Sequence, residues 1–195
     1  MSTTNLKRAL LFIASSCIVS TGFAEPVTYP VDPSHTFPAF EADHWAGLSV
    51  WRCKINETSG TLILDKEAQT GSIDVTMNME SIDFGFEPMN ERTRNDILHT
   101  EQYPTSTYTG TLVNYENGNP TAVEGELTLH GVTKPVNLTI NQFKCQPHFR
   151  HGREVCGADA TVTINRADFG IDYDLQNGFF PEVNLLITVE AGIPE

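Results

Sequence analysis

The chain has 195 residues, a length that suits one compact domain preceded by a short leader. It carries 25 acidic and 12 basic residues, a formal charge of −13. Such a surface repels nucleic acid and anionic lipid headgroups, which argues against polyanionic partners.

The first 24 residues have the pattern of a secretory signal peptide. Lys7 and Arg8 supply a positive start, and residues 9–19 form an apolar core too short to span a bilayer. Small residues around Ala24 suit signal peptidase, which predicts cleavage after that residue and export to the periplasm. An alternative is lipidation at Cys17 in a weak lipoprotein-like motif.

The mature chain, residues 25–195, reads as one domain. Without the signal it holds 10 basic and 25 acidic residues, a charge of −15. It has no later apolar run of about 18 residues, so no transmembrane helix is predicted.

Apolar and polar residues alternate along most of the mature chain, the pattern of half-buried β-strands. Apolar residues recur at every second position in 73–79, 158–164 and 183–189, and Leu62 and Leu64 form a shorter run. Near the N-terminus one face of a predicted strand holds Thr36, Pro38, Phe40, Ala42 and His44. Segments rich in Gly, Asn and Pro separate these runs and predict turns.

Only residues 88–98 resemble a helix, of one or two turns beginning near Pro88. The connections between strands are too short for crossover helices, so the strands should pair antiparallel. The sequence therefore predicts an all-β domain of about eight to ten strands, folded as a sandwich or closed as a barrel. An eight-stranded barrel has room for its own side chains or one slim ligand.

Three cysteines lie in the mature chain. Cys145 and Cys156 flank a loop-like insert and form the natural disulfide pair in an oxidising compartment. Closing so short a loop should contribute on the order of 2–3 kcal/mol in the chain-entropy model. A metal site is the alternative, since His148 and His151 would complete a set of two thiols and two imidazoles. Cys53 is left over, as a buried small side chain or a bridge in a homodimer.

The segment 125–140 contains two alternating runs joined by His130, Gly131 and Lys134. A hairpin explains this pattern, because Gly131 can adopt the positive φ of a tight turn and Pro135 can begin a strand. His130 and Lys134 would then be exposed turn residues. A functional alternative places Lys134 at a barrel mouth, where it would hold a polar headgroup.

Two further pairs of residues have both structural and functional interpretations. His35 and His44 are nine positions apart, so a regular strand would point them to opposite faces, each half-buried beside a carbonyl or carboxylate. Arg166 and Asp168 are two apart, so in an extended segment they would form an ion pair at a strand end. The alternative for Arg166 is contact with a ligand headgroup.

Five segments in order are similar to the YceI family of periplasmic lipocalin-like proteins: 29–44, 60–65, 125–140, 165–172 and 183–191. The resemblance implies an extended antiparallel β-barrel around a long apolar channel, which binds a polyisoprenoid or similar lipid and has no established catalysis. The segments 41–44 and 47–51 and the late cysteine pair resemble the version fused to cytochrome b561 domains. That resemblance implies transient contact with a membrane or a cytochrome b561-type protein. Cys53 stands where family members often have Gly.

The apolar faces are the candidate ligand site. Slim, aromatic and flexible side chains mix on them, and Met adapts to an irregular apolar guest while Ala leaves volume unfilled. The predicted channel residues are Pro38, Phe40, Ala42, His44, Val75, Met77, Met79, Ala160 and Val162. Because only ten scattered cations remain in the mature chain, a neutral headgroup such as a quinone is favoured over a pyrophosphate.

Three functions from different classes are compatible with these patterns. The first is a periplasmic carrier or scavenger of a long-chain lipid, with no other cofactor. The second is a redox or metal module built on Cys145, Cys156 and the nearby histidines. The third is a hydrolase or isomerase, which the sequence disfavours because it has no GxSxG elbow, Ser–His–Asp pattern or paired carboxylates. No catalytic residue is predicted.

Overall fold

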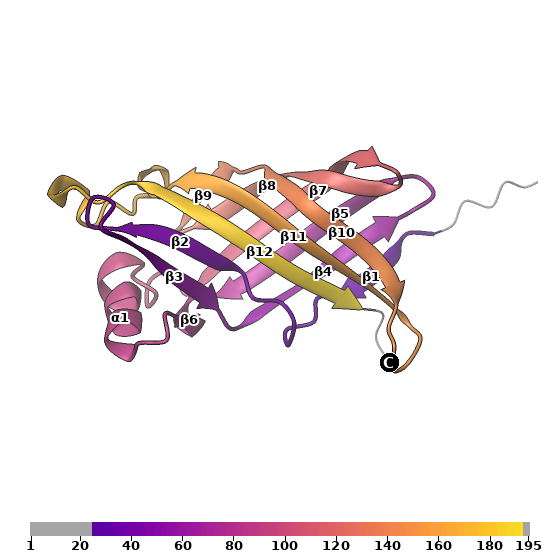
Figure 1. Ribbon diagram of the computed structural model, residues 1–195, viewed down its shortest axis with the longest axis horizontal. Helices are drawn as coiled ribbons and strands as arrows, with labels where there is room; N and C mark the ends of the chain where they lie inside the picture. The colour runs from indigo at the N-terminus through magenta and orange to yellow at the C-terminus, as the bar shows by residue number, and fades with distance from the viewer. Residues whose placement is uncertain (1–24, 193–195) are drawn as a thin grey trace, which may run out of the picture.

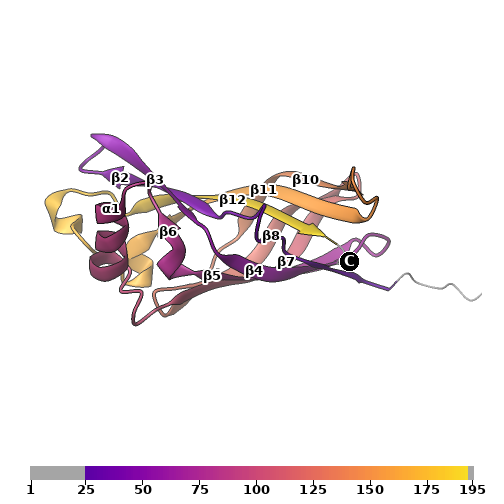
Figure 2. The ribbon, with the colours of Figure 1, turned by 90° about the horizontal axis from the view of Figure 1, so that it is seen from below.

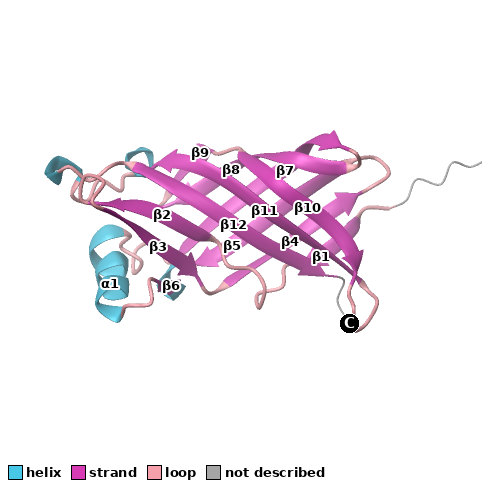
Figure 3. Ribbon diagram, in the orientation of Figure 1, coloured by secondary structure: helices cyan, strands magenta, loops and turns pink. Residues whose placement is uncertain are grey.

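The computed structural model describes residues 25–192, so the predicted signal peptide and its cleavage site lie outside the described residues. Twelve β-strands form one antiparallel sheet (Figures 1 and 3). Nine of them have six or more residues, in agreement with the predicted number. The strands are β1 (Val27–Pro30), β2 (Ala39–His44), β3 (Ser49–Ile55), β4 (Thr58–Asp65), β5 (Thr70–Asn78), β6 (Ile82–Asp83), β7 (Thr105–Glu116), β8 (Asn119–Leu129), β9 (Val132–Pro135), β10 (Leu138–Pro147), β11 (Glu154–Asn165) and β12 (Glu182–Gly192).

The sheet curls around the core as an extended, incomplete barrel. Its strand order is β1-β4-β5-β7-β8-β10-β11-β12-β2-β3-β6, and β9 pairs with β8 outside this path. The segment 31–37 closes part of the gap, since it runs beside the C-terminal half of β12. Asp32 N donates to Glu190 O at 2.8 Å, and Val31 forms a bridge with Ala191. The predicted all-β barrel is therefore confirmed.

One end of the barrel carries the helical segments (Figure 2). They are α1 (Glu87–Arg92), the π-helical turn η2 (Thr93–Ile97) and the 3₁₀ turns η1 (Met79–Ser81), η3 (Arg166–Phe169) and η4 (Leu175–Asn177). Together α1 and η2 cover the helix predicted at 88–98, and Pro88 occupies the first turn, where its missing N–H costs nothing. Within residues 25–192 no helix is long and apolar enough to cross a bilayer.

The hairpin predicted in the segment 125–140 is confirmed. Leu129 pairs with Val132, and the two turn residues between them have positive φ, 52° at His130 and 75° at Gly131. Positive φ at both positions is the geometry that matches the twist of paired strands. His130 is half-buried rather than exposed, because its ring packs on Tyr103 and its Nδ1 lies 3.1 Å from the Phe169 carbonyl oxygen.

At the opposite end of the barrel a polar cluster ties β1 to β11. The buried Tyr29 hydroxyl donates to Glu154 at 2.6 Å, and Lys66 Nζ lies 2.5 Å from the other carboxylate oxygen. The hydrogen bonds from Lys66 and Tyr29 lower the pKa of Glu154. A carboxyl with a lowered folded-state pKa stabilises the protein above its unfolded pKa, and this contribution is lost as the pH falls through the folded value.

We therefore expect Glu154→Gln to lower the free energy of unfolding at pH 7 by about 1 kcal/mol or less, as for other partly exposed ion pairs. At pH 3 the difference between the variant and the wild type should shrink, because this pH lies below the unfolded-state pKa and the contribution from the lowered folded-state pKa is then only partly present. Urea denaturation at both pH values measures this difference. A difference that stays constant between pH 7 and pH 3 would contradict the assignment.

Candidate functional site

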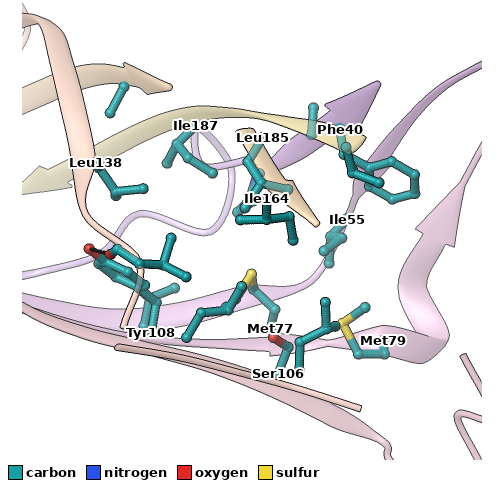
Figure 4. A pocket seen from close by; sticks show the side chains of 18 of the residues that line it. Phe40, Ile55, Met77, Met79, Ser106, Tyr108, Leu138, Ile164, Leu185 and Ile187 are labelled. Carbon is teal, nitrogen blue, oxygen red and sulfur yellow. Dashed lines mark hydrogen bonds between the residues drawn. The ribbon is translucent and has the colours of Figure 1, made fainter. Parts of the chain in front are cut away.

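A long cavity of about 340 Å³ occupies the interior of the barrel, a size within the range of small-molecule sites. Its wall is almost entirely apolar. The alternation of the strands explains this composition, because every second side chain of a strand points inward. Figure 4 shows Leu138, Ile187, Leu185 and Phe40 on one side of the space, facing Tyr108, Met77 and Met79 on the other.

The few hydroxyl groups deep in the wall are mostly engaged with backbone. Ser106 Oγ donates to Thr128 O at 2.7 Å, and Tyr108 donates to Val136 O at 2.9 Å. Thr36 Oγ1 donates to Glu190 O and accepts from Glu190 N. Because these groups already have partners, they offer little to a polar guest, and the deep cavity favours an apolar chain.

The two ends of the cavity differ. At one end the wall includes the buried residues Leu112, Cys156 and Ala191, together with the half-buried Phe143, Gly157, Ala158 and Val189. At the other end, beside α1 and the β2–β3 turn, its residues are half-buried or exposed, so the cavity opens to solvent there. This mouth is formed by Asp43, His44, Trp51, Phe84, Met89, Arg92, Arg166, Tyr173, Asp174 and Phe179.

Aromatic rings and opposite charges are mixed at the mouth. The His44 ring stacks on Trp51 with centroids 4.7 Å apart, and Phe179 meets His44 edge-on. Two guanidinium groups and two carboxylates line the same opening, so the ionised side chains of the mouth sum to no net charge with His44 neutral. A mouth of this kind suits a neutral or weakly polar headgroup.

The interpretation of Arg166 and Asp168 as an ion pair is wrong. The chain does not stay extended there, because η3 begins at Arg166 and Asp168 is exposed. Arg166 instead donates to the Ile171 carbonyl at 3.1 Å and to the Phe180 carbonyl at 3.4 Å. Burial lowers the pKa of Arg166, against the opposing effect of nearby Asp172, Asp174 and Asp43.

The structure places most of the predicted channel residues on the cavity wall. Those that line the cavity are Pro38, Phe40, Ala42, His44, Val75, Met77, Met79 and Ala160. Val162 is the exception: it packs against the core but does not line the cavity. Of the two candidate headgroup residues, Arg166 lines the mouth, whereas Lys134 is exposed on β9 and does not line the cavity.

The two histidines lie apart, as expected. His44 lines the cavity, and His35 is exposed, not half-buried, with its Nδ1 2.8 Å from Asp32 Oδ2. Hydrogen bonding to this carboxylate raises the pKa of His35.

Sequence reasoning missed Trp51, Ile55, Tyr108 and the mouth residues from α1 and the 173–179 loop. The alternation of Trp51, Cys53 and Ile55 on one face of β3 could have predicted that Trp51 and Ile55 point inward.

The predicted disulfide between Cys145 and Cys156 is confirmed. It joins paired positions of β10 and β11, and both sulfurs are used in the bond. The His148 and His151 rings stack on each other, and the described part of the chain brings together no group of three metal-binding side chains. Cys53 is a buried free thiol, and burial raises its pKa to about 12. It is therefore a small apolar side chain with little nucleophilic character.

Comparison with known proteins agrees with this architecture. A family model described as a YceI-like domain matches residues 29–191. The chain belongs to the YceI family. Protein YceI of Escherichia coli O17:K52:H18 is 33% identical over 191 residues, 95% of this chain and 98% of that relative. A UPF0312 protein of Pseudomonas aeruginosa is 32% identical over the same shares of the two chains.

Solved structures share the YceI fold. BcnA of Burkholderia cenocepacia superposes with a TM-score of 0.66 at 19% identity, over 83% of this chain and 99% of that one. A polyisoprenoid binding domain from Saccharophagus degradans gives 0.61 at 16% identity, over 85% and 98%. The YCEI protein of Campylobacter jejuni gives 0.62 at 19% identity, over 96% and 100%.

Proposed function

We propose that this protein binds a polyisoprenoid or similar long-chain lipid inside its barrel and acts as a periplasmic carrier, without catalysis. The apolar cavity is the observation that supports this proposal most strongly. Each methylene moved out of water contributes about 0.8 kcal/mol, so a chain that fills the cavity needs few specific contacts. A polyisoprenoid binding domain with the same fold adds independent support.

The mouth supports a neutral headgroup such as a quinone ring. Its charges balance, and Trp51 and His44 offer stacked rings against which a planar head can pack. A pyrophosphate would meet Asp43 and Asp174 together with the two arginines. The proposed ligand is therefore a neutral ring or polar group on a long apolar chain.

Fluorescence of Trp51 tests this proposal. Trp45→Phe leaves Trp51 as the only tryptophan of the chain, located at the mouth. We expect a long-chain quinone to quench its emission saturably with one site per chain. The same quinone ring without its chain should bind at least about 100-fold more weakly, since it leaves the apolar cavity unfilled.

Two outcomes would contradict the proposal. Equal affinity for the bare ring and the long-chain quinone would show that the cavity does not bind the chain. Tighter binding of a polyprenyl pyrophosphate than of the quinone would leave chain binding intact and overturn the neutral headgroup.

A further inference from the structure

Exposed apolar side chains gather at the open end of the barrel. Trp45 and Leu48, in the β2–β3 turn, are 59% and 68% exposed, and Phe180, in the loop before β12, is 49% exposed. Both segments lie at the end where α1 lies, opposite the C-terminal end of β12 (Figures 1 and 2). We infer that these three residues, here called the rim, dock the mouth of the barrel on a zwitterionic lipid bilayer.

The two segments of the rim are held in a fixed arrangement, because the carboxylate of Asp43 accepts hydrogen bonds from both. Asp43 Oδ1 accepts from Gly47 N at 2.6 Å, and its Oδ2 accepts from Phe180 N at 3.0 Å. A Cβ added to Gly47 would lie 3.6 Å from the Phe180 ring, so the two segments are also in close contact. Asp43 thus fixes the three apolar side chains on one platform and uses both carboxylate oxygens to do so.

The backbone of the β2–β3 turn is held in an unfavourable conformation. Trp45, Ala46 and Gly47 all have positive φ, at 56°, 53° and 82°. A bulky residue such as Trp rarely adopts this region, and such residues persist only where surrounding contacts enforce them. The turn therefore maintains an exposed Trp at a conformational cost, which is the pattern of a functional surface.

The rim adjoins the cavity directly. Asp43 and His44 line the mouth and precede Trp45, and Phe179 lines it and precedes Phe180. A bilayer that buries the rim would consequently face the opening of the channel. This inference rests on the proposed function, because a carrier of a water-insoluble chain must exchange it with a membrane.

Charge identifies the kind of lipid surface. The carboxylate within the rim is engaged in hydrogen bonds, and on the neighbouring strands Arg52 is paired with Glu41 at 2.6 Å. No excess of cations is therefore available here for anionic headgroups, and the whole chain has a formal charge of −13. The amphipathic ring of Trp favours the headgroup level of a membrane–water interface, and this preference does not require charged lipid. Zwitterionic lipid fits this rim best.

Flotation with phosphatidylcholine vesicles tests the inference. We expect the wild type to float with the vesicles, and Leu48→Ser combined with Phe180→Ser to weaken this association on the order of tenfold or more. Phe149→Ser is the matched control, since Phe149 is 84% exposed at the tip of the β10–β11 turn and lies outside the rim. Phe149→Ser should float like the wild type. In Trp51→Phe, Trp45 emission should shift to the blue on addition of vesicles.

Failure to float, or equal flotation of the rim variant and the wild type, would overturn the inference. So would loss of a dimer in the rim variant at unchanged flotation, which would assign the rim to a second copy of the chain. Quinone quenching of Trp51, measured without vesicles in the rim variant that also carries Trp45→Phe, separates this inference from the proposed function. Retained quenching with lost flotation supports docking, whereas vesicle-bound protein that takes no quinone would contradict only the carrier function.

Discussion

Replacing Ala160 by Phe is expected to lower the affinity for a long-chain lipid by about 100-fold while the barrel stays folded. Ala160 is 4% exposed and lines the cavity midway along β11, paired with Ile140 on β10 and Ile187 on β12. A ring at this position would close the channel toward its buried end. Exclusion of about four methylenes costs about 3 kcal/mol, which corresponds to about 100-fold in affinity.

Quenching of Trp51 by a long-chain quinone measures this effect, in the background of Trp45→Phe. Ala68→Phe adds the same ring at an exposed position of the β4–β5 turn and serves as the control, with affinity expected to stay at the wild-type value. If Ala160→Phe bound the long-chain quinone as tightly as Ala68→Phe, the ligand chain could not extend past the middle of the barrel.

The second large effect concerns stability. Gly60→Val is expected to destabilise the protein by about 3 kcal/mol or more, at the upper end of the range for overpacking. A Cβ at Gly60 would overlap the Asp74 carbonyl oxygen and lie 2.9 Å from Val75 Cα on β5. These are backbone atoms, so β4 and β5 would have to separate. The Gly60 carbonyl also accepts from Val31 N at 2.9 Å, which couples this site to the segment that closes the barrel.

Gly157→Val provides the comparison for Gly60→Val. Gly157 is also a strand glycine, but a Cβ there meets its nearest neighbours, Glu190 Cγ and Val189 O, at 3.6 and 3.7 Å. Gly157→Val should therefore lower the free energy of unfolding, measured by urea denaturation, much less than Gly60→Val does. Similar losses for the two variants would show that the close approach at Gly60 does not limit stability.

The alternation of apolar and polar residues was sufficient to predict which side chains face inward along most of the barrel wall. Alternation placed Met77 and Ala160 on inward faces, because a strand with one buried face must repeat every two residues. It could not determine which inward side chains reach the cavity. Val162 shares its face with Ala160, yet it packs into the core without lining the channel.

The mouth could not be predicted in the same way. It is assembled from α1, the end of β2 and the 173–179 loop, which are far apart in sequence, and no local periodicity relates them. Arg166 was expected in an extended segment, whereas the chain turns into η3 there and its guanidinium binds carbonyl groups. Lys134 was expected as an exposed residue, with the barrel mouth as the alternative, and it is exposed on β9, a short strand outside the main path of the sheet.

Native mass spectrometry of the protein expressed with its predicted signal, followed by lipid analysis of a solvent extract, tests the central claim most directly. We predict a wild-type adduct of one long-chain molecule per chain, carrying a neutral headgroup, and its loss in Ala160→Phe. A bare wild-type mass, with an extract that contains no long-chain lipid, would contradict the claim that this barrel carries such a ligand.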